Sequence, residues 1–181
     1  YANGTEENRF TIDSSEDLAA IRQNLTAHYQ VTTTISAEGI DMPLGQLSGS
    51  IVGTNDYAII NGINVNSLSD GFAGLFSSIV EGAYIENLTF VGSINIDQTI
   101  ENKQNIYIGL IAGENHGRLQ NISVRLDQSQ ISINGVAQDE VSSAYIGGLV
   151  GVNNGEITQD FSEIGVNNGE ITQDFSENSE S

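Results

Sequence analysis

Short runs of alternating apolar and polar residues fill most of the chain from Leu47 onward, and this period of two predicts β-strands. Glycine and asparagine separate the runs. Strands this short bury little apolar surface alone, but they form a continuous core when they stack in register as successive coils. The expected strands are residues 50–52, 57–60, 63–65, 84–90, 93–96, 105–112, 119–126 and 130–133.

Two stretches of the sequence, residues 107–113 and 145–151, superimpose without a gap. Each is followed by a polar turn that ends in glycine and then by another strand-like run. A degenerate earlier copy begins at Gly74 and continues at residues 84–90. One unit therefore recurs along an axis, which predicts an all-β solenoid. The expected structural repeat positions are Tyr107, Gly109, Gly113, Gly117, Asn121, Tyr145, Gly147, Gly151 and Gly155.

The spacing of the two clear copies predicts loops that protrude from the coils. The copies start at Tyr107 and Tyr145, roughly twice as far apart as the about 18 residues that a bare three-sided coil needs. We expect the extra residues to form loops at 97–104 and 134–143. These loops supply the candidate binding residues Asp97, Asn102, Asp139 and Glu140, for which the sequence alone names no ligand.

Residues 14–25 have the pattern of a short amphipathic α-helix that precedes the coils. Ser14 starts it, Glu16 and Asp17 lie in its first turn, and an apolar stripe is formed by Leu18, Ile21 and Leu25. Strand candidates flank it at 9–12 and 29–35. Because the exposed end of a solenoid needs a cover, we predict that residues 1–46 cap the coils of residues 47–163.

A duplication closes the sequence. Residues 151–163 recur letter for letter as residues 165–177, with only Ile164 between them. This period is too short for the second copy to take the equivalent place in a next coil, so we expect that it does not continue the stack. We interpret residues 164–181 as a duplicated acidic tail with poor packing.

The net charge narrows the range of partners. Against 24 acidic residues the chain has 5 basic ones, and its net charge is −19. This charge repels phosphate backbones and anionic bilayers, so we expect no nucleic-acid partner. No run of about 18 apolar residues occurs, so we expect no membrane insertion. Without cysteine the chain has neither disulfides nor thiolate chemistry.

Candidate metal-binding groups are few. The two histidines, His28 and His116, fall short of the three or four ligands that a zinc site takes. No HExxH motif occurs, and a turn position explains His116, which aligns with Asn154. The calcium-binding nonapeptide of β-rolls is missing. We predict no cofactor, apart from weak calcium binding by surface carboxylates.

Two further patterns bear on chemistry. Asn87 and Asn121 fall at matching places in the repeat, and we expect a hydrogen bond between them across neighbouring coils.

Parallel β-helices also include polysaccharide lyases and hydrolases, which place carboxylates in a groove along one face. Acidic neighbours occur at 6–7, 16–17 and 139–140, but neighbours in a strand point to opposite faces. Solvated surface is the better interpretation, and we predict no catalytic residue.

The repeat itself resembles a known one. Residues 145–157 contain Tyr-Ile-Gly-Gly-Leu-Val-Gly and then Asn-Asn-Gly-Glu-Ile, and a variant lies at 107–119. Both resemble the GLUG repeat of bacterial surface proteins, found in adhesins and in the β-helical part of the IgA1-specific metalloprotease family. Residues 10–21, 29–31, 47–53 and 57–60 resemble the segment that introduces such repeats. The resemblance covers residues 8–160 and implies a right-handed parallel β-helix that serves as stalk, spacer or adhesive surface.

Three functional hypotheses remain open. The first is a non-catalytic module of an extracellular, cell-surface or cell-wall protein, with an adhesive or spacer role and a host or neighbouring-cell protein or glycan as partner. The second is an accessory β-helix of a secreted IgA1-type metalloprotease whose catalytic domain lies elsewhere. The third is a carbohydrate-active enzyme. We favour the first, and we expect the chain to be part of a longer protein.

Overall fold

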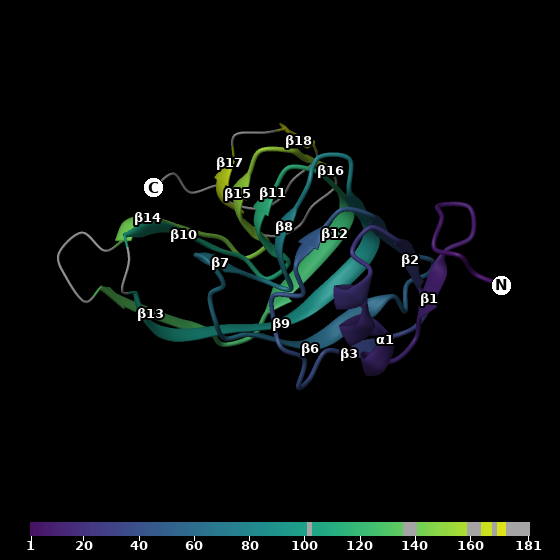
Figure 1. The fold of residues 1–181 in the computed structure, drawn as a ribbon, viewed down its shortest axis with the longest axis horizontal. Helices are drawn as coiled ribbons and strands as arrows, with labels where there is room; N and C mark the ends of the chain where they lie inside the picture. Colours follow the sequence, from purple (N-terminus) through teal and green to yellow (C-terminus); the bar gives the residue numbers. More distant parts are fainter. Residues whose placement is uncertain (101–102, 136–140, 159–163, 168–169, 173–181) are drawn as a thin grey trace.

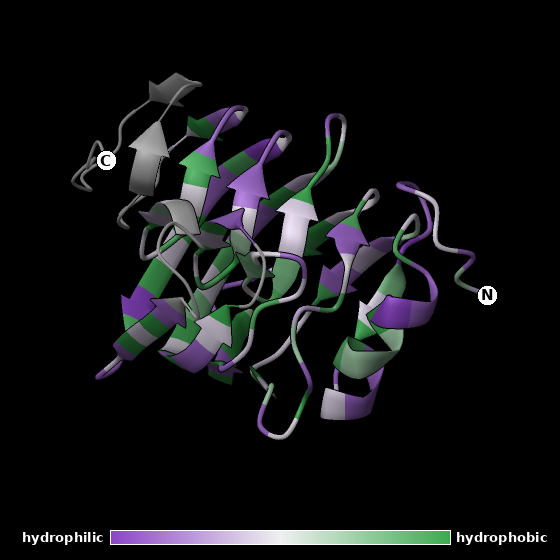
Figure 2. Cartoon of the chain, turned by 60° about the vertical axis from the view of Figure 1, so that its left-hand side comes forward, coloured by the Kyte–Doolittle hydropathy of each residue, from purple (hydrophilic) through white to green (hydrophobic). Residues whose placement is uncertain are grey.

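A computed structural model describes residues 1–100, 103–135, 141–158, 164–167 and 170–172. The chain forms a β-solenoid of parallel strands with a short helix near the N-terminus (Figure 1). Successive strand levels, called rungs below, follow one another along one axis, starting beside the N-terminal helix (Figure 2). The predicted parallel β-helix is therefore confirmed.

The largest sheet follows one side of the solenoid from end to end. Its main path, in order, is β1 (Phe10–Ile12), β2 (His28–Val31), β5 (Ser50–Gly53), β9 (Tyr84–Ile100), β12 (Arg118–Leu126), β16 (Glu156–Thr158) and β18 (Glu170–Thr172). Three strands extend this side beyond the path: β3 (Ile35–Ser36), β6 (Ile59–Val65) and β13 (Gln130–Gly135).

Two smaller sheets form the other sides. One contains β4 (Gln46–Leu47), β8 (Phe76–Ile79), β11 (Ala112–Asn115), β15 (Val150–Asn153) and β17 (Ile164–Asn167). The other contains β7 (Phe72–Ala73), β10 (Gln104–Ile108) and β14 (Val141–Ile146). The single strand expected at 105–112 is thus two strands. Residues 109–111 form the turn between them. Only glycine fits at position 109 of this turn, because a Cβ there would lie 2.3 Å from the Ala112 carbonyl oxygen.

The core consists of side chains that stack on their counterparts in the next rung. The clearest column runs through the largest sheet, where successive register partners are Tyr29, Ile51, Ile85, Leu119 and Ile157. All five are buried. Burying one such side chain stabilises the folded state by about 1.5 to 3 kcal/mol. The alternation of apolar and polar residues along each strand therefore determines which face of the strand turns inward.

The loop prediction for 97–104 and 134–143 is wrong at the residues that the structure describes as strand, namely 97–100, 104, 134–135 and 141–143. Residues 101–102 and 136–140 of these predicted loops lie outside the described residues. β9 continues to Ile100, and its end pairs with β13 from Asn95↔Gln130 to Ile100↔Gly135. β10 and β14 then return the chain, and the lengthened coil encloses more core, with Ile94, Ile96, Ile100, Ile106 and Ile108 buried. Asp97 is an exposed residue of β9. Asn102, Asp139 and Glu140 lie outside the described residues.

The N-terminal helix is confirmed in the region where it was predicted. α1 (Ser15–Ala20) continues as the 3₁₀ helix η1 (Ile21–Gln23). Ser14 caps it by accepting a hydrogen bond from Asp17 N at 3.1 Å, and the Asp17 carboxylate accepts one from Asp13 N at 3.2 Å. That donation by the Asp13 backbone lowers the pKa of Asp17. Leu18 and Ile21 are fully buried in the core. No helix of the described residues is both long and apolar enough to cross a membrane.

The duplicated C-terminal segment continues the stack, which corrects the expectation from its short period. β17 pairs with β15 at Val150↔Ile164, and β18 pairs with β16 at Ile157↔Ile171. The described residues of this short coil repeat a strand in two of the three sheets. The packing of side chains beyond residue 163, which we expected to be poor, lies outside the described residues.

Replacing Gly117 with alanine should loosen the stack. A Cβ there would lie 2.2 Å from the Ala83 carbonyl oxygen, which accepts a hydrogen bond from Arg118 N at 3.0 Å and so cannot move freely. We expect urea denaturation to show a loss of about 2 to 3 kcal/mol in the free energy of unfolding. Gly39→Asn is the control, because nothing lies within 4 Å of that Cβ and asparagine tolerates its φ of +79°. Equal losses in both variants would contradict this explanation.

Candidate functional site

Three stacked aromatic rings form a column on the outer surface. Tyr107 of β10 is the register partner of Phe72 in β7 and of Tyr145 in β14. Ring centroids are 4.8 Å apart between Phe72 and Tyr107 and 5.2 Å apart between Tyr107 and Tyr145, with planes tilted by 12° and 14°. The spacing of parallel strands, about 4.8 Å, suits ring stacking. Gly113 leaves room for the rings, because a Cβ there would lie 3.0 Å from Phe72 Cδ1.

The sequence pointed to two of these rings and missed the third. Tyr107 and Tyr145 were predicted as equivalent positions, and the structure places them in register. Phe72 was missed because the earlier copy was aligned only from Gly74. The available signal was its spacing, since Phe72 precedes Gly74 by two residues just as Tyr107 precedes Gly109.

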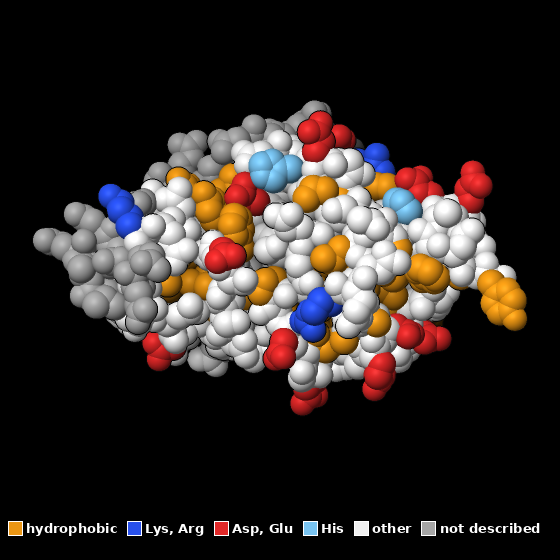
Figure 3. Space-filling view, in the orientation of Figure 1, with side chains coloured by type: hydrophobic (Ala, Val, Ile, Leu, Met, Phe, Trp, Pro, Cys, Tyr) orange, Lys and Arg blue, Asp and Glu red, His pale blue; other side chains and the backbone are white. Residues whose placement is uncertain are grey.

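A groove of about 530 Å³ lies beside the aromatic column. Gln46, Ser78 and Glu114 are register partners on β4, β8 and β11 and line it in a row. The remaining lining residues are Phe72, Val80, Glu81, His116 and Asn154. Figure 3 shows hydrophobic side chains grouped over β7, β10 and β14, with acidic side chains and a histidine beside them. The groove therefore combines one apolar wall with a polar floor.

A hydrogen-bonded carboxylate lies in the groove. Glu114 Oε2 is 2.8 Å from His116 Nε2 and accepts a second hydrogen bond from Asn154 Nδ2 at 3.4 Å. The Glu114 side chain is 18% exposed and that of His116 is 45% exposed. His116 lies in the turn between β11 and β12, as predicted. The two contacts position one carboxylate oxygen and leave Glu114 Oε1 without a hydrogen bond to a described residue.

Two of the five basic residues converge on one tyrosine on the neighbouring side. Arg9 donates a hydrogen bond to Tyr84 Oη at 2.6 Å and lies 5.6 Å from the ring centroid. The guanidinium of Arg118 lies 4.8 Å from the same centroid and pairs with Glu86 Oε1 at 2.5 Å. Cation–π contacts of this kind tie together rungs that are far apart in sequence.

A serine and a histidine also meet in this region. Ser50 Oγ lies 2.6 Å from His28 Nδ1 and accepts a hydrogen bond from Arg9 Nη1 at 2.6 Å. A serine beside a histidine is one requirement for a nucleophile. Ser50 is completely buried, however, so a substrate could not reach its hydroxyl. The contacts join β2 and β5 and support a structural role.

Two asparagines form a ladder inside the core, which the sequence analysis missed. Asn115 Nδ2 donates to Asn153 Oδ1 at 2.9 Å, and both residues are 0% exposed. Their Oδ1 atoms accept hydrogen bonds from Gly117 N and Gly155 N. The signal was the Asn-x-Gly spacing in both copies, which places each asparagine two residues before a glycine. These bonds satisfy polar groups that would be costly if buried without partners.

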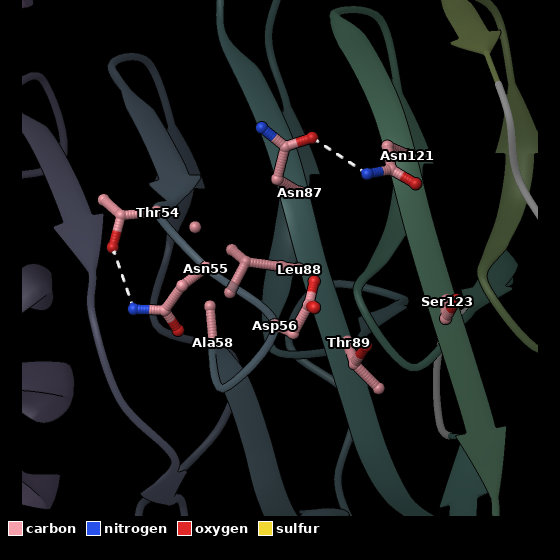
Figure 4. A pocket seen from close by; sticks show the side chains of 10 residues that line it. Thr54, Asn55, Asp56, Ala58, Asn87, Leu88, Thr89, Asn121 and Ser123 are labelled. Atoms are coloured by element: carbon pink, nitrogen blue, oxygen red, sulfur yellow. Dashed lines mark hydrogen bonds between the residues drawn. The ribbon is translucent and has the colours of Figure 1, made fainter.

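The predicted hydrogen bond between Asn87 and Asn121 is confirmed, and this second asparagine pair lies on the surface. Asn121 Nδ2 donates to Asn87 Oδ1 at 3.0 Å, and both residues have positive φ angles. Figure 4 shows the pair facing each other above a polar depression of about 360 Å³. Its other side chains include Asn55, Asp56, Thr89 and Ser123. This depression has no aromatic wall.

The predicted site residues do not meet in one place. Asp97 lies opposite Ser132 of β13 and lines neither the groove nor the depression of Figure 4. Gly117 and Gly155 lie in the turns before β12 and β16, and Gly147 lies in the turn after β14. Among the described residues, no group of three or more His, Asp or Glu is placed to hold a metal ion.

The buried asparagine ladder should matter more than the exposed one. Asn115→Ala removes the acceptor of Gly117 N and the donor to Asn153. We therefore expect urea denaturation to show a loss of about 2 to 3 kcal/mol in the free energy of unfolding. Asn121→Gly keeps the positive φ and removes only an exposed bond, so we expect a change within about 0.5 kcal/mol. A larger loss for Asn121→Gly would show that the surface pair is the main axial tie.

Comparison with protein-family models, with curated proteins and with solved structures finds no match for this chain. The resemblance to the GLUG repeat therefore stays a prediction.

Proposed function

We propose that this chain is a non-catalytic β-helical module of a bacterial cell-surface or secreted protein, with an adhesive or spacer role outside the cell. One observation carries this proposal: side chains on several faces bond along the axis to the next rung. The aromatic column, the Asn115–Asn153 ladder and the Asn87–Asn121 pair are examples. Such ladders favour a stiff rod with repeated surfaces, which suits a spacer or an adhesive element.

The contacts of the polar residues favour this function over carbohydrate cleavage. A glycosidase uses two carboxylates that face a scissile bond, one of them free to exchange a proton. In the groove Glu114 gives one oxygen to His116 and Asn154. The other lining carboxylate, Glu81, is an exposed turn residue. In the Ser50–His28 pair the serine is completely buried, so a substrate cannot reach its hydroxyl. The proposed partner is a host or neighbouring-cell protein or glycan, and the GLUG resemblance supports the extracellular location.

Bead adhesion combined with a turnover assay tests the proposal. Beads coated with the chain are washed over surfaces that carry neutral glycans, acidic glycans or matrix proteins, and released sugar or peptide is measured in the same wells. We expect retention on at least one surface without release of product. The Gly117→Ala/Asn115→Ala double variant should lose retention, because disrupted rungs no longer present a continuous face.

Pulling single molecules separates the two proposed roles. A spacer without adhesive activity should give unretained beads and a chain that resists unfolding under force. Product release in the wells would contradict a non-catalytic module. Absence of retention together with unfolding at low force would contradict both the adhesive and the spacer role.

A further inference from the structure

The aromatic column ends at Phe72 with an unused stacking position. Its sheet has the order β14-β10-β7, so β7 is the last strand and pairs only with β10 among the described strands. Phe72 stacks on Tyr107 on one side, and no other described ring contacts it. Phe72 also lines the groove. A flat molecule with an apolar face therefore finds, at the end of the column, the place that the next aromatic ring would take.

A serine hydroxyl in the same groove has no partner among the described residues. Ser78 is 8% exposed and lines the groove, and its hydroxyl makes no hydrogen bond to another described residue. The hydroxyl itself is open to the groove, so a ligand hydroxyl can bond to it. Its register partners add the side-chain amide of Gln46 and the unused Oε1 of Glu114. Donors and acceptors thus follow one another along the groove floor.

The dimensions suit a linear chain of sugar rings. The groove spans residues of β4, β8 and β11 and the turn after β15, and four rungs at a spacing of about 4.8 Å extend over about 14 Å. A volume of about 530 Å³ lies in the usual range of small-molecule sites. Pyranose rings offer an apolar face for stacking and equatorial hydroxyls at the edge, which matches an aromatic wall beside a polar floor.

The charge of the groove selects among sugars. Glu81 and Glu114 line it, and no lysine or arginine of the described residues does. The whole chain carries a net charge of −19, so uronic acids and sulfated sugars are repelled. We infer that this groove binds a neutral oligosaccharide, with one pyranose ring stacked on Phe72 and its hydroxyls bonded to Ser78, Gln46 and Glu114. This inference deepens the adhesive role proposed above and rests on it.

Titration calorimetry and NMR with defined probes test the inference. The probes are neutral hexose oligosaccharides, namely cello-, malto- and manno-oligosaccharides, with polygalacturonate as the acidic counterpart. We expect at least one neutral probe to bind and polygalacturonate to bind more weakly than it. Phe72→Ala should weaken binding about tenfold through loss of the stacking face. Ser78→Ala should weaken it about fivefold through loss of one hydrogen bond.

Matched controls separate binding from folding. Ser77→Ala changes the neighbouring serine, which does not line the groove, and Tyr57→Ala removes an exposed ring elsewhere on the surface. Both should leave affinity unchanged. Phe72→Tyr should retain binding, because it keeps the ring and the column. Thermal melting of each variant checks that the fold is intact.

Three outcomes would overturn the inference. One is that no neutral probe binds to the folded wild-type chain, and another is tighter binding of polygalacturonate. The third is loss of affinity in Tyr57→Ala with none in Phe72→Ala. Bead retention on a matrix protein alone would leave the adhesive module standing while refuting a glycan groove, so the two proposals fail separately.

Discussion

Parallel pairing in register is the constraint on which the other features of this solenoid depend. In a parallel stack each residue lies opposite its counterpart one rung away, at about 4.8 Å. Apolar side chains then meet apolar side chains, as Ile51, Ile85 and Leu119 do. Rings meet rings, and amides meet amides. Like charges in the same arrangement repel each other. In one row of register partners Arg118 lies between Tyr84 and Glu156, whereas the next pair of that row, Glu156 and Glu170, brings two acidic positions together.

The same constraint does not determine how many residues connect one paired segment to the next. Only the paired segments need to match, so the residues between them vary widely in number. The stretch from Arg118 to its partner Glu156 is twice as long as the stretch from Phe10 to its partner Tyr29. The longer coils add β10, β14 and the end of β9, whose isoleucines enlarge the core. The aromatic column belongs to the sheet of β7, β10 and β14, and through Phe72 it supplies the apolar wall of the groove.

The sequence was informative where a local pattern determines the structure, and it failed where geometry depends on distant segments. The Ser14 cap predicted the helix, and the repeated stretches predicted the register of their strands. Residues 97–100 look polar enough for a loop, but pairing with β13 makes them strand. The candidate groove was harder still, because Gln46, Ser78 and Glu114 lie far apart in the chain and nothing local marks them as neighbours.

The short coil that ends the described chain has a consequence for how such a protein changes in length. Among the described residues, β17 and β18 add a level in two of the three sheets. A duplication of this short segment therefore extends these two sheets by one level without shifting any existing pair. Length becomes a quantity that can vary in single steps, by copying a small stretch of coding sequence, while the surfaces nearer the N-terminus keep their geometry.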